Sequence, residues 1–491
     1  MTTFLIALAL LVGGYFIYGK IAEWIFGIDA GRKTPAYTHS DGVDFVPMAT
    51  WKVFLIQFLN IAGIGPIFGA IMGAMFGPAA FLWIVFGTIF AGAVHDFISA
   101  MISMRSNGAS LPEIVGDELG TTVKNVMRVF TLVLLVLVGA VFVLTPSQVI
   151  ASMTPEWFDA RICALLIFAY YIAATMLPID KVIGRIYPVF GAALLFMAVA
   201  LMGYLLLGGV EIPDGMADGL FNRRPDAASG THPLFPMLCI SIACGAISGF
   251  HATQSPMMAK CLKSERLARP VFYGAMVTEG VVALIWAAAA IAFTGGYGQL
   301  ADYMAQPGHA PGTLVTDLSF GWLGIAGGAL ALLGVVAAPI STGDTALRSA
   351  RLILADAFRM EQKKFSNRLI LCVPVFVITF VLMLIDFDVL WRYFAWCNQT
   401  LAVFTLWACT VWLARHGKFY MLTLVPALFM QVVTVSYILL APVPEGFGLD
   451  HELSFWLSAG SCALCLGLFA RYLTKLPANG LPERDERIEA V

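Results

Sequence analysis

About thirteen apolar runs, each close to the roughly 20 residues that cross a bilayer as a helix, divide this chain. Only 12% of its 491 residues are charged, whereas a soluble domain carries about 25%, and the mean hydropathy is +0.84. The chain is therefore predicted to be an all-α integral membrane protein. The predicted spans cover residues 2–19, 51–75, 79–104, 126–149, 160–178, 186–209, 234–258, 270–295, 319–342, 368–386, 390–414, 419–441 and 453–473.

The basic residues give these spans an orientation, because Lys and Arg collect in the cytoplasmic loops of membrane proteins. With the N-terminus outside, only Arg161, Arg223, Arg224 and Arg392 of the 29 Lys and Arg residues lie outside, which leaves 25 inside. The opposite orientation reverses that ratio. We therefore expect a multi-pass membrane protein with its N-terminus outside and its C-terminus in the cytoplasm.

Charge and cysteine content narrow the class of partner. The formal net charge is −2 and no basic block suggests nucleic acid, so we expect the lipid bilayer as the surrounding partner. The nine cysteines lie mostly in apolar runs, where cysteine behaves as a small hydrophobic residue. Cys462 and Cys465 form a CxxC pair without a second pair, and no HExxH motif occurs, so we predict no metal and no cofactor. The sequence leaves the oligomeric state open.

Ionisable side chains interrupt three of the apolar runs. They are His95 and Asp96 in the third run, His251 in the seventh and Glu279 in the eighth. Such a group in a membrane span is costly, so it usually faces a cavity and marks a substrate or ion pathway. A hydrogen-bond network that holds the bundle together is the alternative interpretation.

Two spans carry helix-breaking residues at mid-membrane. The second contains Asn60-Ile-Ala-Gly-Ile-Gly-Pro-Ile-Phe-Gly69, and the seventh contains Cys244-Gly-Ala-Ile-Ser-Gly-Phe-His251. Proline removes a backbone donor and glycine destabilises a helix interior. Unwound backbone at this depth is tolerated where it lines a cavity or is buried in protein, although close helix packing through small residues is an alternative. The substrate-site candidates in these spans are Asn60, Gly63, Gly65, Pro66, Ser248 and His251.

The spacing of the broken spans predicts an internal repeat. They are the second and the seventh, five positions apart, and since five is an odd number, the second set of five helices runs inverted relative to the first. Paired broken helices at matching positions of two inverted halves indicate the binding site of a secondary transporter. We therefore divide the chain into an accessory first helix and loop (1–50), a first repeat (51–210), a second repeat (232–414) and accessory C-terminal helices (415–491).

Three polar residues are predicted to share one depth. Counted at about 1.5 Å per helical residue, Asn60, Asp96 and Glu279 lie roughly 12–14 Å from the inner boundary, in a core about 30 Å thick. A shared polar pocket would give this agreement, and a carboxylate in it can exchange a proton during a transport cycle. His95 and Asp96 point about 100° apart on a helix, so we do not expect both to face one small site.

The end of the ninth predicted span combines hydroxyls with a carboxylate. Ser341, Thr342 and Asp344 could bind a hard cation through oxygen, or they could cap a helix over 345–360. Both interpretations stay open from these residues alone. The basic segment 343–367 that follows is typical of an interfacial helix on the inner leaflet.

Six segments between the first loop and about residue 360 form one recognisable set. They are Asp41-Gly-Val-Asp-Phe-Val-Pro47, Ile61-Ala-Gly-Ile-Gly-Pro66, Leu82-Trp-Ile-Val-Phe-Gly87, Ala91-Gly-Ala-Val-His-Asp-Phe97, Ser248-Gly-Phe-His251 and Thr342-Gly-Asp-Thr-Ala-Leu-Arg-Ser-Ala-Arg351. Together they resemble the carbon starvation protein A (CstA) family. The resemblance implies uptake of short peptides and, in some members, of pyruvate by proton-coupled symport, in the bacterial inner membrane. It also implies a LeuT-like core of the amino acid–polyamine–cation superfamily.

The LeuT-like resemblance also implies a cation site beside the first break. Carbonyls near Ala62 and Gly65, with the hydroxyls of Ser341 and Thr342, would be the sodium ligands. The chain departs from the family pattern in two ways. His95 stands where the pattern has glutamine, and the chain is shorter than the long family members, so substrate assignments made on those do not transfer directly.

The sequence thus favours an ion-coupled symporter that imports a short peptide or a pyruvate-like carboxylate. It contains no Walker A motif, which disfavours transport driven by ATP. An intramembrane metalloenzyme is also disfavoured, because an adjacent His–Asp pair does not readily chelate one ion. A membrane sensor that binds a metabolite without moving it is the alternative. The residues do not distinguish peptide from pyruvate, or proton from sodium.

Overall fold

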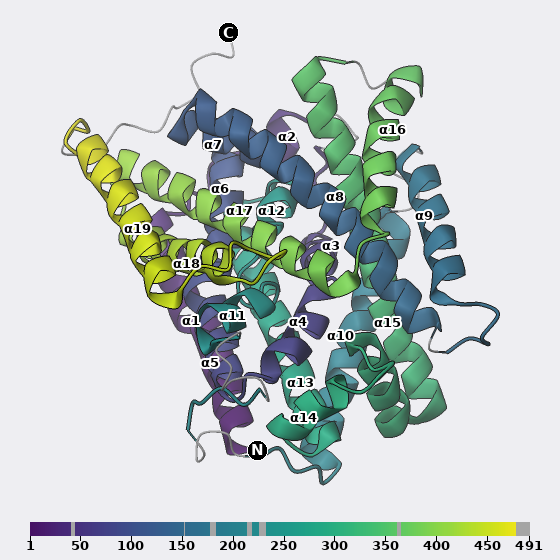
Figure 1. Ribbon diagram of the computed structural model, residues 1–491. Helices are drawn as coiled ribbons and strands as arrows, with labels where there is room; N and C mark the ends of the chain where they lie inside the picture. Colours follow the sequence, from purple (N-terminus) through teal and green to yellow (C-terminus); the bar gives the residue numbers. More distant parts are fainter. Residues whose placement is uncertain are drawn as a thin grey trace.

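Helices make up the regular structure of the described chain (Figure 1). The computed structural model describes residues 1–40, 45–151, 153–176, 183–213, 219–224, 232–360 and 365–477. The N-terminal half contains α1 (Thr2–Phe26), α2 (Pro35–Thr38), α3 (Thr50–Ile61), α4 (Gly65–Ala74), α5 (Ala79–Phe86), the π-helical segment η1 (Gly87–Gly92), α6 (Ala93–Arg105), α7 (Leu111–Leu119), α8 (Thr121–Ala151), α9 (Ala160–Met176) and α10 (Ile183–Leu207). The C-terminal half contains α11 (Leu234–Ser241), α12 (His251–Ala259), the 3-10 turn η4 (Glu265–Leu267), the π-helical segment η5 (Arg269–Tyr273), α13 (Gly274–Thr294), α14 (Tyr297–Met304), α15 (Pro311–Phe358), α16 (Phe365–Leu382), α17 (Phe387–Arg415), α18 (Met421–Leu440) and α19 (His451–Leu473).

The predicted spans coincide with these helices. Among the described residues, nine helices are long and apolar enough to cross a membrane, or up to eleven if each bent pair is one span. The two predicted spans outside that count are 160–178, where the apolar helix is shorter, and 234–258, which is divided between α11 and α12. The all-helical membrane fold with two broken helices is therefore confirmed.

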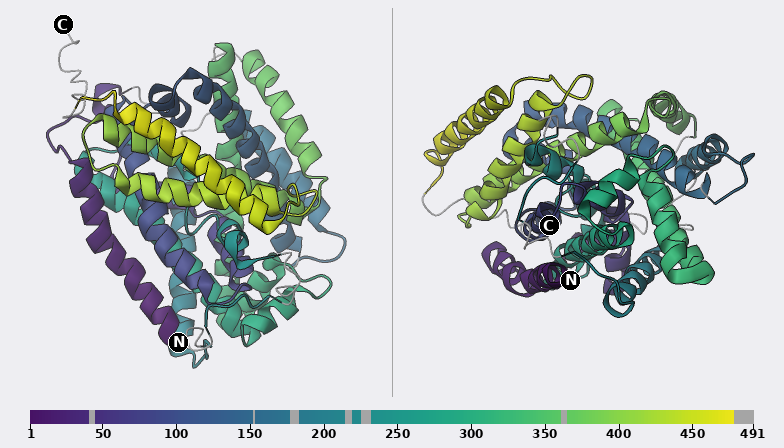
Figure 2. Two further views of the ribbon diagram at one scale, coloured as in Figure 1. Left: turned by 60° about the vertical axis from the view of Figure 1, so that its left-hand side comes forward. Right: turned by 60° about the horizontal axis from the view of Figure 1, so that its bottom comes forward.

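The helices differ in how much of their surface the protein covers. Only 22% of the most apolar window of α1 and of α19 is buried, against 89% for Val389–Arg415. Figure 2 shows α1 and α19 at the edge of the bundle. Trp24 on α1 is 80% exposed, as expected of a side chain that faces lipid. α1 and α19 are thus peripheral, whereas the broken helices lie in the buried core.

Two corresponding helices carry a π-helical segment. The span from α5 to α6 contains η1, and the span that ends in α13 begins with η4 and η5. These are the third and eighth of the predicted spans, so they occupy matching positions in the two repeats. A π segment inserts an extra residue into a helical turn and is frequent at functional sites. Asp96 follows the first segment by four residues and Glu279 follows the second by six.

The ninth predicted span differs from the expectation at its C-terminal end. α15 continues without interruption from Thr342 to Phe358, and Arg348 and Arg351 within it are each only 6% exposed. The predicted helix cap at Ser341, Thr342 or Asp344 is wrong, because these residues lie inside a helix. The prediction of an interfacial helix over 343–367 is also wrong for 343–351, because this segment packs against α8 and α9. Its arginines find backbone acceptors there, since Arg348 donates to Ala174 O and Arg351 to Thr175 O, each at 2.8 Å. Leu352 and Phe358 are exposed, and residues 361–364 lie outside the described residues.

Candidate functional site

The first break separates α3 from α4 by three residues and bends the span by 48°. Pro66 lies in the first turn of α4. Backbone N–H groups in the first turn have no acceptor within the helix, so the N–H that proline lacks costs no hydrogen bond there. Asn60 is the penultimate residue of α3 and is buried, and its Oδ1 has no hydrogen-bond partner among the described residues. A buried polar atom without a partner needs water, an ion or a ligand. The break therefore provides one polar group that is available to a bound molecule.

The second break is longer and runs from Ile242 to Phe250. Gly245 within it has a φ of +92°, a conformation that side chains disfavour. Asn398 of α17 holds the distal part, since its Oδ1 accepts hydrogen bonds from Phe250 N at 2.7 Å and from Ser248 Oγ at 3.0 Å. Thr88 in η1 donates to Gly245 O at 2.8 Å. Side chains from two other spans thus replace the missing helical hydrogen bonds.

The two breaks lie directly against each other. Gly65, Gly69 and Gly73 form a stripe along one face of α4, which we call the α4 glycine stripe. A Cβ added at Gly65 would lie 2.3 Å from Cys244 Cβ, and one at Gly69 would lie 2.9 Å from Ser241 O. Glycine at these positions allows the α4 backbone to contact the end of α11 and the second break.

His251 links two buried carboxylates at the start of α12. Its Nδ1 lies 3.0 Å from Asp96 Oδ2, and its Nε2 lies 3.4 Å from Glu279 Oε2. All three side chains are completely buried. Glu279 also accepts a hydrogen bond from Gly245 N at 3.1 Å through its other oxygen. One imidazole therefore connects α6 with α13 through the second break.

His95 belongs to the same group of residues. Its Nδ1 lies 2.8 Å from Asp96 Oδ1, and both side chains are fully buried. The expectation that His95 and Asp96 face different sites is wrong, because the imidazole turns back toward the neighbouring carboxylate. We call His95, Asp96, His251 and Glu279 the polar cluster. Its members come from both predicted repeats, as the shared depth of Asp96 and Glu279 predicts.

The polar cluster can change its number of protons. When Asp96 is ionised, it can accept from the Nδ1–H groups of both imidazoles, so His251 Nε2 faces Glu279. A proton between these two atoms can belong to nitrogen or to oxygen, and neither atom has another hydrogen-bond partner in the described structure. A buried charge needs a compensating partner. A proton gained or lost here therefore changes the electrostatic balance between α6, α12 and α13.

Two members of the polar cluster and the nearby Cys244 also lie at metal-ligand spacing. Donor atoms of Cys244, His251 and Glu279 lie within 4.8 Å of one another, and all three residues are buried. The thiol already has polar neighbours, because Asn398 Nδ2 donates to Cys244 Sγ at 3.5 Å and Ser248 Oγ lies 3.7 Å from it. Structural zinc sites use four protein ligands. We therefore interpret these residues as part of a polar network, and elemental analysis can test that interpretation.

The predicted cation ligands are brought together only in part. A Cβ on Gly63 would lie 3.6 Å from Thr342 Oγ1, so the first break and α15 meet here. The hydroxyls of Ser341 and Thr342 both donate to Ala338 O, at 2.7 and 3.0 Å. A hydroxyl oxygen that donates its hydrogen also has lone pairs that can accept. Asp344 lies one turn further along α15, where Arg348 Nη2 is 3.6 Å from its Oδ2.

The remaining substrate-site candidates lie at the two breaks. Ser248 is within the second break, Pro66 and Gly65 begin α4, and Ala62 caps α3. Sequence reasoning missed Asn398 and Thr88. The available signal was the pair Asn398-Gln399 in the middle of an apolar span, which is unusual for a lipid-facing helix.

Comparison with known proteins gives one family. The family model described as "Carbon starvation protein CstA" matches residues 1–215, 156–320 and 325–437. An uncharacterized membrane protein of Haemophilus influenzae is 45% identical over 339 residues, which cover 60% of this chain and 91% of that protein.

Several relatives carry functional names, among them the following two. The pyruvate/proton symporter BtsT of Escherichia coli is 30% identical over 331 residues, covering 55% of this chain and 46% of BtsT. The peptide transporter CstA of Campylobacter jejuni is 29% identical over 344 residues, covering 57% and 48%. This chain spans about half the length of these two transporters.

Two solved structures share the fold. MhsT in complex with L-phenylalanine has a TM-score of 0.56 at 16% identity, covering 84% of this chain and 99% of MhsT. The manganese transporter of Eremococcus coleocola has a TM-score of 0.54 at 12% identity, covering 89% and 98%. At these identities the likeness concerns the fold alone, which is the LeuT-like inverted repeat.

Proposed function

Because this chain belongs to the carbon starvation protein CstA family, we propose that it is a secondary transporter that imports a small carboxylate or a short peptide together with a proton. The observation that supports this proposal best is the contact of His251 with Asp96 and Glu279 at the second break. An ionisable group in a membrane bundle usually belongs to a substrate or ion pathway. Here three of them meet beside unwound backbone.

The proposed substrates share a carboxylate, and the breaks suit that group. Two relatives are named a pyruvate/proton symporter and a peptide transporter. α4 and α12 both begin at a break, and the positive end of a helix dipole attracts a carboxylate. The unpartnered Oδ1 of Asn60 is an acceptor, which suits the ammonium group of a peptide better than pyruvate.

A small cavity supports a path from the predicted outer face. It has a volume of about 40 Å³ and lies between α4, α11 and α17. Arg224, His232 and Arg392 are among the residues that line it. Cationic side chains raise the local concentration of anions, although the charge of Arg392 is paired with Glu445. A carboxylate entering here would approach the α4 glycine stripe and then the two breaks.

The proposed cycle couples one proton to one change of conformation. A proton added between His251 and Glu279 reduces the repulsion between Glu279 and Asp96, which favours close packing of α6 against α12 and α13. Loss of that proton toward the cytoplasm restores the repulsion. Rocking of the two repeats around the fixed site would then expose it alternately to each side.

Sodium is the second candidate for the coupling ion. Its site would lie between the carbonyls near Ala62 and Gly65 and the hydroxyls of Ser341 and Thr342. The closeness of Gly63 to Thr342 favours it. In this case the polar cluster would only position α12.

Uptake in liposomes tests the proposal. We would reconstitute the purified protein and measure labelled pyruvate and alanyl-alanine uptake under a proton gradient and, separately, under a sodium gradient. Proton-driven accumulation of one substrate is expected, and Asp96→Asn or Glu279→Gln should reduce it to the level of empty liposomes. Ser341→Ala and Thr342→Ala should leave it unchanged.

The other outcomes distinguish the alternatives. Uptake that needs sodium and is lost in Ser341→Ala or Thr342→Ala would move the coupling site to α15. Substrate binding without uptake or exchange under either gradient would favour a membrane sensor. Stoichiometric zinc in the purified protein would reopen a metal site at Cys244.

A further inference from the structure

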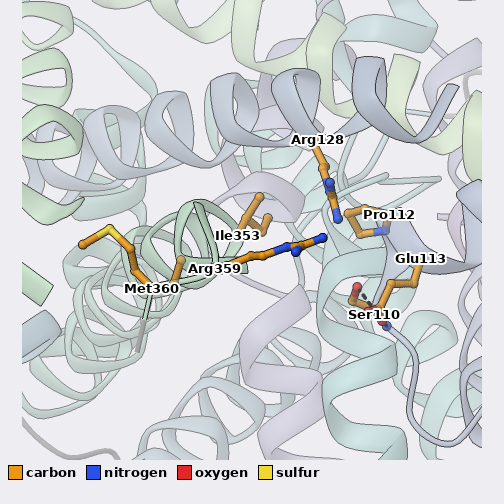
Figure 3. Close-up of a pocket in the computed structure, with 8 residues that line it drawn as sticks. Ser110, Pro112, Glu113, Arg128, Ile353, Arg359 and Met360 are labelled. Atoms are coloured by element: carbon orange, nitrogen blue, oxygen red, sulfur yellow. Dashed lines mark hydrogen bonds between the residues drawn. The ribbon is translucent and has the colours of Figure 1, made fainter. Parts of the chain in front are cut away.

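A polar cavity of about 500 Å³ lies far from the two breaks in sequence and contains none of their residues. It is formed by the start of α7, the start of α8 and the end of α15 (Figure 3). The positive-inside pattern predicts that it opens on the cytoplasmic side. Cavities of this size hold small organic ligands.

Two arginines point into this cavity from different helices. Figure 3 shows Arg128 extending from α8 and Arg359 extending from the end of α15 toward the same space. Within the described part of the chain, neither guanidinium makes an ion pair or a hydrogen bond. Arginine is suited to phosphate because its planar donors bind two oxygens at once. The cavity therefore has unused donors for an anion.

The backbone holds Arg359 in an unfavourable conformation. Met360 N donates to Ala355 O at 2.9 Å, which closes a helix with a Schellman turn. Arg359 occupies the position in that turn where glycine is usual, with a φ of +53°. This conformation costs a residue other than glycine roughly 1 kcal/mol. An arginine kept there despite the strain indicates that its side chain has a role at this place.

The surroundings favour a phosphate that belongs to a lipid. Glu113 is the acidic side chain at the rim, and its Oε2 accepts from Ser110 N at 2.8 Å and Ser110 Oγ at 3.0 Å. The residues next to the arginines expose apolar side chains, since Val129 is 64% and Phe358 is 66% exposed. Acyl chains could lie against such a surface, whereas a soluble phosphate has no apolar part that would contact it.

We propose that this cavity binds the phosphate group of an anionic phospholipid through Arg128 and Arg359. The two arginines belong to different predicted repeats, so one headgroup connects them. If the protein is a transporter as proposed above, a bound phospholipid changes the rate of transport, because it restrains the relative motion of the repeats. Only this effect on transport rests on the proposed function; the binding itself does not.

Lipid binding can be measured without transport. Full-length protein in detergent would be titrated with short-chain phosphatidylglycerol, short-chain phosphatidylcholine and glycerol phosphate, and the melting temperature followed. Phosphatidylglycerol is expected to raise the melting temperature more than phosphatidylcholine does. Arg128→Gln combined with Arg359→Gln should weaken its apparent affinity at least roughly tenfold, since each loses a charged hydrogen bond.

Control variants distinguish loss of the binding site from a general effect of removing arginine. Arg266→Gln removes an exposed arginine that is predicted to lie on the same side, and it should keep the phosphatidylglycerol effect. The double variant Arg128→Lys/Arg359→Lys keeps both charges and should show an intermediate affinity. It replaces the double glutamine variant in the test if that variant does not fold. An equal effect of glycerol phosphate at equal concentration would overturn the lipid assignment. An unchanged affinity in both double variants would overturn the site itself.

Discussion

His251 is the residue on which the proposed coupling depends most. It is the member of the polar cluster that contacts both Asp96 and Glu279, through different nitrogens. A single imidazole in this position can carry a proton from one carboxylate to the other. His95 contacts Asp96 alone among the acidic groups of the described chain, so the two histidines should differ in importance.

Glutamine at each histidine position tests that difference. His95→Gln should retain most of the proton-driven uptake, because an amide N–H can replace Nδ1–H as a donor to Asp96. His251→Gln should abolish it, because an amide cannot take up a proton. Substrate counterflow without a gradient would be measured in parallel. Equal loss in both variants would contradict the assignment of His251.

Glu118, which lies outside the predicted membrane spans, should make the stability of the protein depend on pH. It lies on α7, and Arg415 Nη1 is 3.3 Å from its Oε1. Burial raises the pKa of the Glu118 carboxyl to about 7, against the opposing effect of Arg415. Between the ordinary value near 4.5 and about 7, the folded protein keeps a proton that the unfolded chain has released. The resulting stability is full at low pH and is lost as the pH rises through about 7.

The melting temperature in detergent should therefore fall between pH 5 and pH 8. Glu118→Gln should flatten that slope, because the amide does not titrate. Glu156→Gln, at an exposed position in a loop, should leave the slope as it is in the unchanged protein. A Glu118→Gln variant with the original slope would show that other groups cause it.

At the scale of elements, the α4 glycine stripe is the feature most sensitive to added volume. Gly69→Ala places a methyl group 2.9 Å from Ser241 O, and that backbone cannot move without displacing the second break. Overpacking of this kind costs about 1–3 kcal/mol, so we expect a lower melting temperature and little uptake. Gly203→Ala on α10 meets nothing within 4 Å and should be neutral. Normal uptake by Gly69→Ala would contradict the close contact.

Sequence patterns predicted these elements unevenly. Proline and glycine predicted both breaks, because such residues have few other uses in a membrane span. The shared depth of Asp96 and Glu279 was predicted, but the contact of both with His251 depends on helix rotation, which depth does not give. Asn398 was missed because its partners, which are Phe250 N, Ser248 Oγ and Cys244 Sγ, belong to a segment that is distant in the sequence. The continuation of α15 was missed because basic residues indicate loops, unless carbonyls on a neighbouring helix accept their hydrogen bonds.

The orientation of the whole molecule is still a prediction. Figure 1 shows α1 beginning at the bottom of the molecule and α19 ending toward the top, as an odd number of crossings requires. We expect the N-terminus outside and the C-terminus inside a bacterial inner membrane. Reporter fusions after Lys475 and in the loop between α18 and α19 should give cytoplasmic and external signals respectively. The reverse pattern would also reverse the direction of the proposed proton path.

The contact between the α4 glycine stripe and the second break limits how the molecule can move. The α4 backbone has no side chains at these positions, so it lies directly against Ser241 O and against the side chains of Cys244 and Ile242. α4 and the second break therefore cannot slide past each other without a collision. They can still tilt about the contact. The contact therefore acts as a pivot, and the displacement of a helix end should increase with its distance from the contact. Spectroscopic labels placed at increasing distance from Gly69 would show displacements that grow in proportion.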